Sequence, residues 1–178
     1  VRVVMDCCAQ EKQFNPFYAY VLQRFVAHGK NTRSAVVQRF GDCFQTLSES
    51  EQRRLTNIAL LMSHVIAKGV LSLSMFKAVG FESLDGRSLE FFRVLFLNLL
   101  LDAEPSSIGT IFGRIASQRD LESLSDGLTL FLYLFINREL RPRFVEELLA
   151  RRRPIEKTRN QEAEAWLTRQ ELELKGRT

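Results

Sequence analysis

The chain has 178 residues, of which 46% are hydrophobic and 26% charged, and its formal net charge is +4. This balance is typical of one folded domain and excludes a disordered polypeptide, and no apolar run reaches the length of a membrane span without a charged or polar break. The modest positive charge permits contact with nucleic acid without arguing for it.

A first helix is predicted from the N-terminus to about Lys12, with inward side chains Val4, Met5 and Cys8. A proline steers the residue before it away from the α region, so Asn15, which precedes Pro16, ends this helix. The same asparagine offers its side-chain oxygen to the first free amides of a second helix. We therefore expect a sharp corner between two helices, which Phe14 and Phe17 can bury.

The next three helices follow from apolar spacing and end signals. The second covers residues 16–28, followed by Gly29, with Phe17, Tyr20 or Val21, and Phe25 on one side. Thr32 is predicted to cap the third, whose apolar residues are Ala35, Val36, Phe40 and Phe44. A capping box at residues 48–51 opens the fourth, which ends at Lys68-Gly69 and has the inner stripe Leu55, Ile58, Ala59, Met62 and Val65.

Beyond the fourth helix we predict a short helix over residues 73–79, a loop over 80–86 and an apolar helix over 87–103. A helix that is apolar nearly all round packs on several sides. Pro105 begins the next helix, and the last core helix spans residues 121–138, with Leu124, Leu128, Phe131, Leu132 and Phe135 inward. Gly127 within it indicates close helix packing. The 14 Phe residues predict a core built by ring packing between helices.

These elements predict an all-α fold, a HEAT-like α-solenoid of antiparallel helical pairs with a charged helical C-terminal extension; a compact irregular bundle is the alternative. We place a helical domain at residues 1–140 and the extension at 141–178. The extension holds ten Lys/Arg and seven Glu, a net charge of +3, and includes the run Arg151, Arg152 and Arg153.

No catalytic, cofactor or metal site can be assembled from the sequence. For the two histidines, His28 and His64, the sequence offers no nucleophile and no orienting group that would complete a catalytic site. No phosphate-binding or dinucleotide motif is present. The three cysteines, Cys7, Cys8 and Cys43, lack zinc-like spacing and are expected to be reduced thiols. We interpret the chain as a non-enzyme without cofactors.

Three segments carry a family resemblance. CCAQEKQFNPFY at residues 7–18 resembles the CCxQEKxYNPFY signature of the MA-3 domain in nucleolar MIF4G-domain proteins, relatives of translation initiation factor 4G. FESLDGRSLEFFRVLF at 81–96 and DLESLSDGLTLFL at 120–132 are similar to two later stretches of that domain. Two departures stand out: the family's Leu-Asp-x-Pro lacks its proline at Arg87, and the family's first helical pair is expected to be missing from this chain.

The resemblance implies a HEAT-like scaffold in small-subunit ribosome biogenesis and pre-rRNA processing, located in the nucleolus. Its implied partners are a DEAD-box RNA helicase of the initiation-factor-4A type and proteins of the pre-ribosomal small-subunit particle. The resemblance implies no membrane as a partner. In related domains, acidic residues before the long central helix meet basic residues of the helicase. Asp85 corresponds best to them, with Glu82 nearby. Asp85 read from its position alone is a helix cap, and both roles are compatible.

Two further functions stay open. One is an RNA-binding module that uses Arg151, Arg152 and Arg153 for non-specific phosphate contact. The other is an MA-3 adaptor in pre-mRNA splicing or translation control. The Asn-Pro-Phe-Tyr corner at residues 15–18 disfavours the splicing branch, because the spliceosomal relative continues differently after a similar CCAQ opening.

Overall fold

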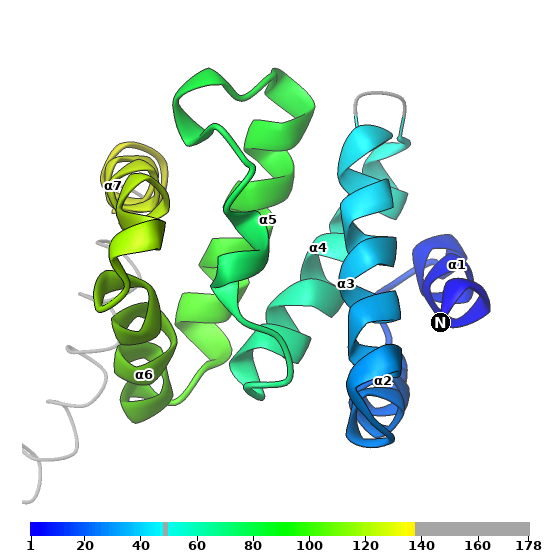
Figure 1. The fold of residues 1–178 in the computed structure, drawn as a ribbon. Coiled ribbons are helices and arrows are strands. Elements are labelled where there is room, and N and C mark those ends of the chain that lie inside the picture. The colour runs from blue at the N-terminus through cyan, green and yellow to red at the C-terminus, as the bar shows by residue number, and fades with distance from the viewer. Residues whose placement is uncertain (48–49, 138–178) are drawn as a thin grey trace, which may run out of the picture. The chain divides into compact units, whose positions relative to one another are not determined.

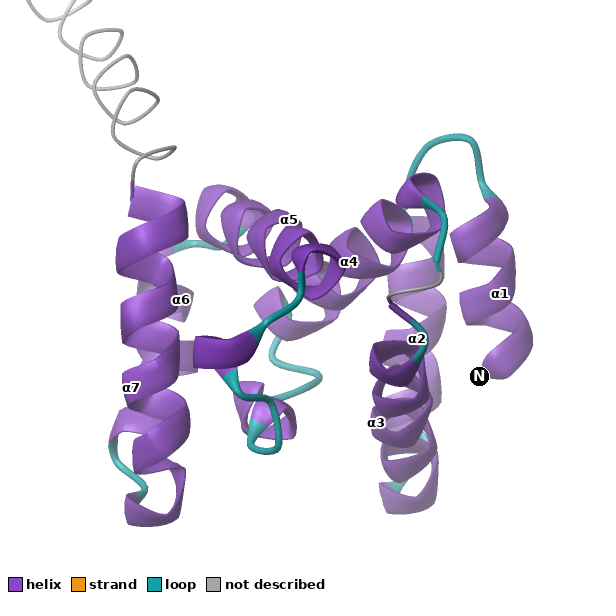
Figure 2. Cartoon of the chain, turned by 90° about the horizontal axis from the view of Figure 1, so that it is seen from above, coloured by secondary structure: helices purple, strands orange, loops and turns teal. Residues whose placement is uncertain are grey.

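A computed structural model describes residues 1–47 and 50–137 of the chain. Within these ranges the chain forms α-helices and short 3-10 or π-helical turns without any strand, which confirms the all-α prediction (Figures 1 and 2). The helices are α1 (Arg2–Gln10), α2 (Phe17–Ala27), α3 (Lys30–Gln45), α4 (Gln52–Ala67), α5 (Gly86–Asp102), α6 (Pro105–Ala116) and α7 (Glu122–Phe131). None of the described helices is long and apolar enough to cross a membrane.

The described helices belong to one compact unit, Val1–Ile136, and a second unit begins at Asn137. In the first unit α2 and α3 pack as an antiparallel pair, α4 and α5 share the most extensive contact, and α6 packs on α7 (Figure 2). The α4–α5 pair lies between the other two pairs in Figure 1. The predicted extension at 141–178 and its three arginines lie outside the described residues.

The central pair departs from the antiparallel arrangement. Arg87 at the start of α5 donates to Gln52 at the start of α4 (2.7 Å), and Asn98 later in α5 donates to Ser63 later in α4 (2.6 Å). Both contacts join residues 35 apart, so α4 and α5 run in the same direction. The long connection over residues 68–85 makes this possible because it returns the chain to the starting end of α4.

The buried stripe of α4 is as predicted. Its members Leu55, Ile58, Ala59, Met62 and Val65 are 5% exposed or less, and α4 contacts α1 and α2 as well as α5. A helix that packs on several neighbours needs apolar groups on more than one face, so Leu61 and Ile66 are fully buried too. The helix ends at Lys68-Gly69, where Gly69 has a φ of +68°, as the sequence indicates.

Phenylalanine rings fill the core between α5, α7 and the connection that precedes α5. The ring of Phe81 lies 4.9 Å from that of Phe92 and 5.5 Å from that of Phe131, measured between centroids. Phe76 and Phe96 join the same cluster, which confirms the predicted ring-packed core. Each buried Phe contributes roughly 1.5–3 kcal/mol through burial alone, so this cluster is a main source of stability.

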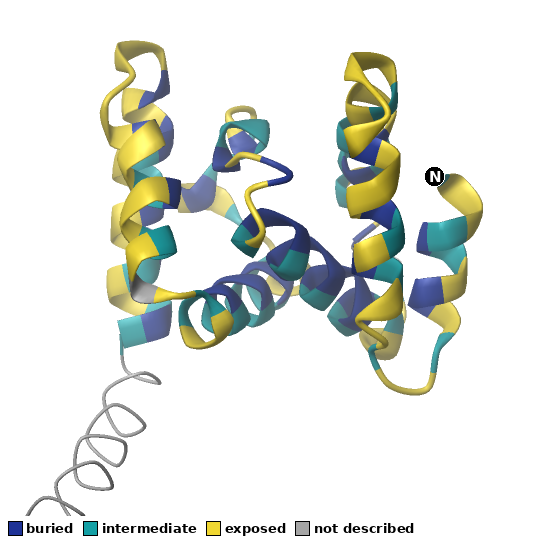
Figure 3. Cartoon of the chain, turned by 90° about the horizontal axis from the view of Figure 1, so that it is seen from below, coloured by how far each residue is buried: buried dark blue, intermediate teal, exposed yellow. Residues whose placement is uncertain are grey.

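The predicted inner face of α2 is wrong. The structure buries Ala19, Leu22 and Val26, and it leaves Phe17 61% and Tyr20 60% exposed. Phe25 is 37% exposed. The helix is apolar on most of its circumference, so periodicity alone could not choose a face; the smaller side chains let α2 approach α3 and α4 closely. Figure 3 shows long exposed stretches on α2 and α3.

Several predicted ends also differ. Helix α3 begins at Lys30, after Gly29 with a φ of +144°, so Thr32 lies inside the helix and does not cap it. Ser48 of the predicted capping box lies outside the described residues. The predicted helix over 73–79 is a 3-10 turn, Leu73–Phe76.

The last core helix changes its winding. Its α-helical part ends at Phe131, and the π-helical turn Leu132–Ile136 follows. The wider turn buries Ile136 and leaves Leu132 only partly buried, against the prediction.

Candidate functional site

The corner at residues 11–18 is held by side-chain hydrogen bonds. The amide of Phe17 donates to Oδ1 of Asn15 (3.0 Å), as the sequence predicts. The hydroxyl of Tyr18 donates to Oε1 of Glu11 (2.8 Å), and this bond raises the pKa of Tyr18 to about 12. Phe14 packs against the ring of His64 at 4.9 Å, whereas Phe17 is mostly exposed and contacts the ring of Tyr18 edge-on at 6.0 Å. The corner is thus a structural device.

A buried amide on α4 holds the end of α1. Nδ2 of Asn57 donates to the carbonyl of Cys8 (3.1 Å) and to that of Glu11 (2.9 Å), and the Asn57 side chain is almost fully enclosed. The last carbonyls of a helix lack their usual partners within it. That of Cys8 accepts a long bond from the amide of Glu11 (3.3 Å), and the Asn57 amide completes the hydrogen bonding of both carbonyls. Burial raises the pKa of the Cys8 thiol to about 12, which leaves it protonated and unreactive.

The loop that precedes α5 positions the two acidic residues that the resemblance singles out. Phe81 anchors this loop in the ring cluster, and Glu82 beside it is exposed. Asp85 caps α5: its Oδ1 accepts the amide of Ser88 (2.7 Å), and this bond lowers the pKa of Asp85. The helix-cap interpretation of Asp85 is confirmed. Its carboxylate remains exposed at the helix start.

The surface hollow that Glu82 lines does not include Asp85. Glu82 lines this shallow groove together with residues of α7, and we call this set the acidic groove: Glu82, Glu122, Ser123, Asp126, Gly127 and Leu130. The groove exists because α7 approaches the loop closely at Gly127, where an added Cβ would lie 3.3 Å from the Cβ of Phe81. The predicted close packing at Gly127 is therefore confirmed.

Sequence reasoning missed Glu122 and Asp126 as site residues. Their signal was the four-residue spacing, which places both carboxylates on one face of a helix next to Gly127. Nothing in the sequence indicated that Glu82, about forty residues earlier, would face them. The groove presents three carboxylates beside Leu130, which is 51% exposed, and this arrangement suits a basic partner surface with an apolar side chain.

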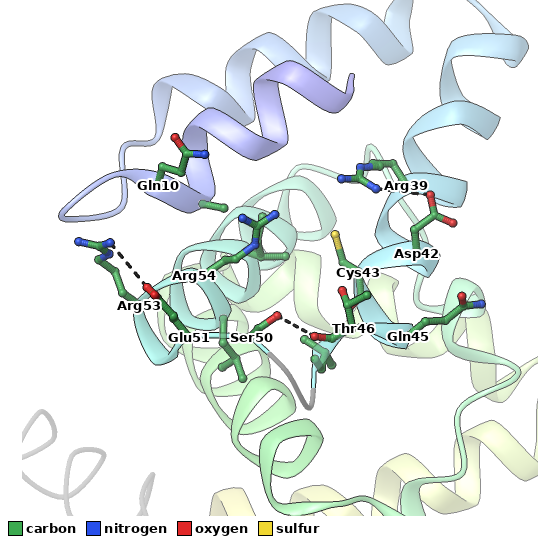
Figure 4. A pocket seen from close by; sticks show the side chains of 14 residues that line it. Gln10, Arg39, Asp42, Cys43, Gln45, Thr46, Ser50, Glu51, Arg53 and Arg54 are labelled. Atoms are coloured by element: carbon green, nitrogen blue, oxygen red, sulfur yellow. Dashed lines mark hydrogen bonds and ion pairs between the residues drawn. The ribbon is translucent and has the colours of Figure 1, made fainter.

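A separate hollow of about 750 Å³ lies between α1, α3 and the start of α4 (Figure 4). Its arginines are paired with acids: Arg39 contacts Asp6 (3.2 Å) and Asp42 (3.6 Å), and Arg54 contacts Asp6 (3.3 Å). Burial raises the pKa of Cys43, the thiol in this wall. The charges are largely neutralised by one another, so the hollow offers no evident ligand site.

Among residues 1–47 and 50–137, no group of three or more His, Cys, Asp or Glu side chains could hold a metal ion. The two histidines bond within their own helices, His28 to the carbonyl of Arg24 (2.7 Å) and His64 to that of Leu60 (3.0 Å). The predicted RNA-contacting residues Arg151, Arg152 and Arg153 lie outside the described part of the chain.

Comparison with known proteins shows what this sequence is similar to. Residues 1–72 match the model of the MA3 domain. Nucleolar MIF4G domain-containing protein 1 from Mus musculus and from Homo sapiens are each 32% identical over 136 residues, 76% of this chain and 16% of each relative. Pre-mRNA-splicing factor CWC22 from Eremothecium gossypii is 27% identical over 104 residues, 57% of this chain and 19% of that protein.

The chain therefore spans less than a quarter of the length of these relatives. The matched family and relatives are helical proteins of the MA3 and MIF4G type, and none of their names describes a catalytic activity. The resemblance and the HEAT-like fold are both confirmed: this is an MA3-type helical chain related to the nucleolar MIF4G domain-containing proteins.

Proposed function

We propose that this chain is a non-catalytic interaction scaffold in small-subunit ribosome biogenesis and that it acts with a DEAD-box RNA helicase of the initiation-factor-4A type. The similarity to nucleolar MIF4G domain-containing protein 1 carries the proposal. The nucleolar names of these relatives agree with the predicted nucleolar location. Proteins of the pre-ribosomal small-subunit particle are the further partners of this proposal.

The surface proposed for the helicase is acidic and rigidly mounted. Phe81 anchors in the core the loop that carries Glu82 and Asp85, and the amide of Ser88 holds the Asp85 carboxylate in place. Glu122 and Asp126 of the acidic groove extend the negative charge onto α7. A preorganised cluster of one sign attracts a basic surface and fixes its orientation on binding.

Charge substitutions test this surface with purified chain and recombinant DEAD-box helicases in calorimetric titrations. We expect the pair Glu82→Lys and Asp126→Lys to weaken the complex, and Asp102→Lys, an exposed change on α5, to leave it unchanged. Asp85→Asn separates the two roles of Asp85, because asparagine caps helices well but carries no charge. Unchanged affinity in both the Glu82→Lys, Asp126→Lys pair and the Asp85→Asn variant would remove the acidic surface from the proposal.

Residues 141–178 are proposed as a separate basic extension that makes auxiliary, non-specific RNA contact through Arg151, Arg152 and Arg153. The net charge of +3 over this segment supports the assignment. Binding through phosphates depends steeply on salt, so truncation after residue 149 should flatten the salt dependence. A shallow slope in the intact chain would contradict the tail as an RNA contact.

A splicing adaptor is the second candidate function, and the similarity to pre-mRNA-splicing factor CWC22 favours it. Sequencing of the RNA that co-purifies with the tagged full-length parent protein distinguishes the two pathways. Enrichment of small-subunit precursor rRNA supports the ribosomal proposal. Enrichment of spliceosomal RNA overturns the pathway while keeping the fold.

A further inference from the structure

We propose that the outer face of α2, together with Lys68 at the end of α4, binds single-stranded RNA by base stacking and phosphate contact. This surface is distinct from the basic tail and from the acidic groove, and we call it the aromatic face. Its members are Phe17, Tyr20, Gln23, Arg24 and Lys68.

The first observation is the exposure of two aromatic rings on α2, of which Phe17 contacts only the edge of the Tyr18 ring at a centroid distance of 6.0 Å. Phe17 is 61% exposed and Tyr20 is 60% exposed, although both belong to a helix whose opposite side is fully packed. At 100° per residue, Phe17, Tyr20 and Arg24 lie within about 60° of one another around the helix axis. The three side chains therefore share one face, directed away from the buried Ala19, Leu22 and Val26.

The second observation is the charge around these rings. Residues 12–41 contain no Asp or Glu, and they contain the basic residues Lys12, Arg24, Lys30, Arg33 and Arg39. Arg39 is neutralised by Asp6, but no ion pair engages Arg24 or Lys68 in the described part of the chain. The excess of basic residues in this stretch attracts a polyanion, and the carboxylate just before it, that of Glu11, is engaged by the hydroxyl of Tyr18.

A small hollow lies between the ring of Tyr20 on α2 and Lys68 at the end of α4. Tyr20 and Gln23 of α2 line it together with His64, Lys68 and Val70, and no acidic residue contributes to its wall. The hollow is small, about 20 Å³, so the proposal places the phosphate outside it, at the Lys68 ammonium next to a base stacked on Tyr20. Gln23 adds an amide that can donate to a base edge or to a phosphate oxygen.

The chemistry favours a nucleic acid strand over a protein helix. The large hydrophobic side chains that α2 exposes are the aromatic residues Phe17, Tyr20 and Phe25, whereas a groove for an amphipathic helix also exposes aliphatic side chains. Aromatic rings interspersed with Arg and Lys are the pattern by which proteins hold unpaired strands, since every base has a flat face to stack. A duplex offers no such bases, so single-stranded RNA is the expected ligand.

The test measures fluorescence anisotropy of a labelled oligouridylate with the full chain, in a background where Arg151, Arg152 and Arg153 are changed to Ser. This background removes the contribution proposed for the tail. Phe17→Ala and Tyr20→Ala should each weaken binding about tenfold, and Phe17→Trp should preserve it. Tyr133→Ala, which removes an equally exposed ring on the π-helical turn, is the matched control and should change nothing.

Two further variants separate stacking from other modes of binding. Phe17→Leu keeps apolar bulk without a π face, so it should lose as much affinity as Phe17→Ala. Arg24→Gln and Lys68→Gln should each reduce the slope of log affinity against log salt by about 0.7, the value for one phosphate of a single strand. Circular dichroism checks that every variant remains folded, which the exposure of these side chains leads us to expect.

The proposal is overturned if the background chain does not bind the oligouridylate, or if the Phe17→Ala and Tyr20→Ala double variant binds it unchanged. Retained affinity in Phe17→Leu would also overturn base stacking on Phe17 as the mode of binding. The helicase titrations with Glu82→Lys and Asp126→Lys are independent of this result, because those residues lie on other elements.

Discussion

Replacing Asn57 by Asp would test whether one buried amide holds α1 against the core. The substitution keeps the shape of the side chain, but it exchanges the NH₂ group for an oxygen that faces the carbonyls of Cys8 and Glu11. Two donated hydrogen bonds are lost, and a carboxylate is placed at a position that is 3% exposed. Both effects act in the same direction.

The size of the effect follows from these contacts. Each hydrogen bond contributes about 1 kcal/mol net to stability, which sets a loss of about 2 kcal/mol before any cost of the buried charge. Burial next to two carbonyl oxygens raises the pKa of the new carboxyl above its unfolded value of about 3.9. We therefore expect N57D to lose about 3 kcal/mol or more at neutral pH.

The sign of the pH dependence makes the prediction specific. A group whose pKa is raised on folding retains its stability below the unfolded pKa and loses it as the pH rises through the folded pKa. The deficit of N57D relative to the unaltered chain should thus grow from about pH 4 upwards.

Urea unfolding followed by circular dichroism measures this deficit in the free energy of unfolding. The free energy of unfolding falls by about 1–3 kcal/mol per molar urea, so the expected deficit corresponds to a midpoint shift of about 1 M or more. Thr56→Ala is the matched control, because Thr56 only bonds the carbonyl of Gln52 within its own helix. Hydrogen exchange of the α1 amides should accelerate in N57D alone. A deficit below about 0.5 kcal/mol, or one independent of pH, would refute the role assigned to Asn57.

Two other predictions concern glycines and the cap of α5. Gly113→Ala should stabilise α6 by up to about 1 kcal/mol, since nothing lies within 4 Å of an added Cβ. Gly127→Ala should bring no such gain, because its added Cβ would meet Phe81 at 3.3 Å. Equal gains of the two variants in thermal unfolding would contradict the close packing at Gly127. The lowered pKa of Asp85 means that its cap contributes stability above the unfolded pKa and loses it as the pH falls through the folded pKa. Asp85→Asn should therefore remove that part of the acid sensitivity, and identical acid unfolding curves for the two chains would show that the charge of Asp85 adds nothing to the cap.

Local signals predicted much of the fold, because they act within one or two helical turns. The α4 stripe from Leu55 to Val65, the stop at Gly69 and the start of α6 at Pro105 all depend on neighbouring residues, and all agree with the structure. The packed face of α2 depends on which neighbours approach it. An apolar circumference carries no information on that choice, so Phe17 was predicted inside and lies outside.

The candidate site was less predictable for the same reason. The cap at Asp85 is a local feature and was recognised from its position. The groove that joins Glu82 to Glu122 and Asp126 arises only when α7 packs on the loop near Phe81. Likewise, the parallel direction of α4 and α5 depends on the path of residues 68–85, whose short turns leave no periodic pattern.

The two proposed surfaces are separated by the buried core, and this separation has a measurable consequence. In Figure 1 the α2–α3 pair and the α6–α7 pair lie on opposite sides of α4 and α5. Substitutions at sites that share no contacts add within about 0.3–0.5 kcal/mol. The double variant should therefore lose as much helicase affinity as Glu82→Lys alone and as much RNA affinity as Phe17→Ala alone. A coupled loss beyond that margin would mean that one ligand spans both surfaces, and it would replace two separate binding surfaces by a single extended one.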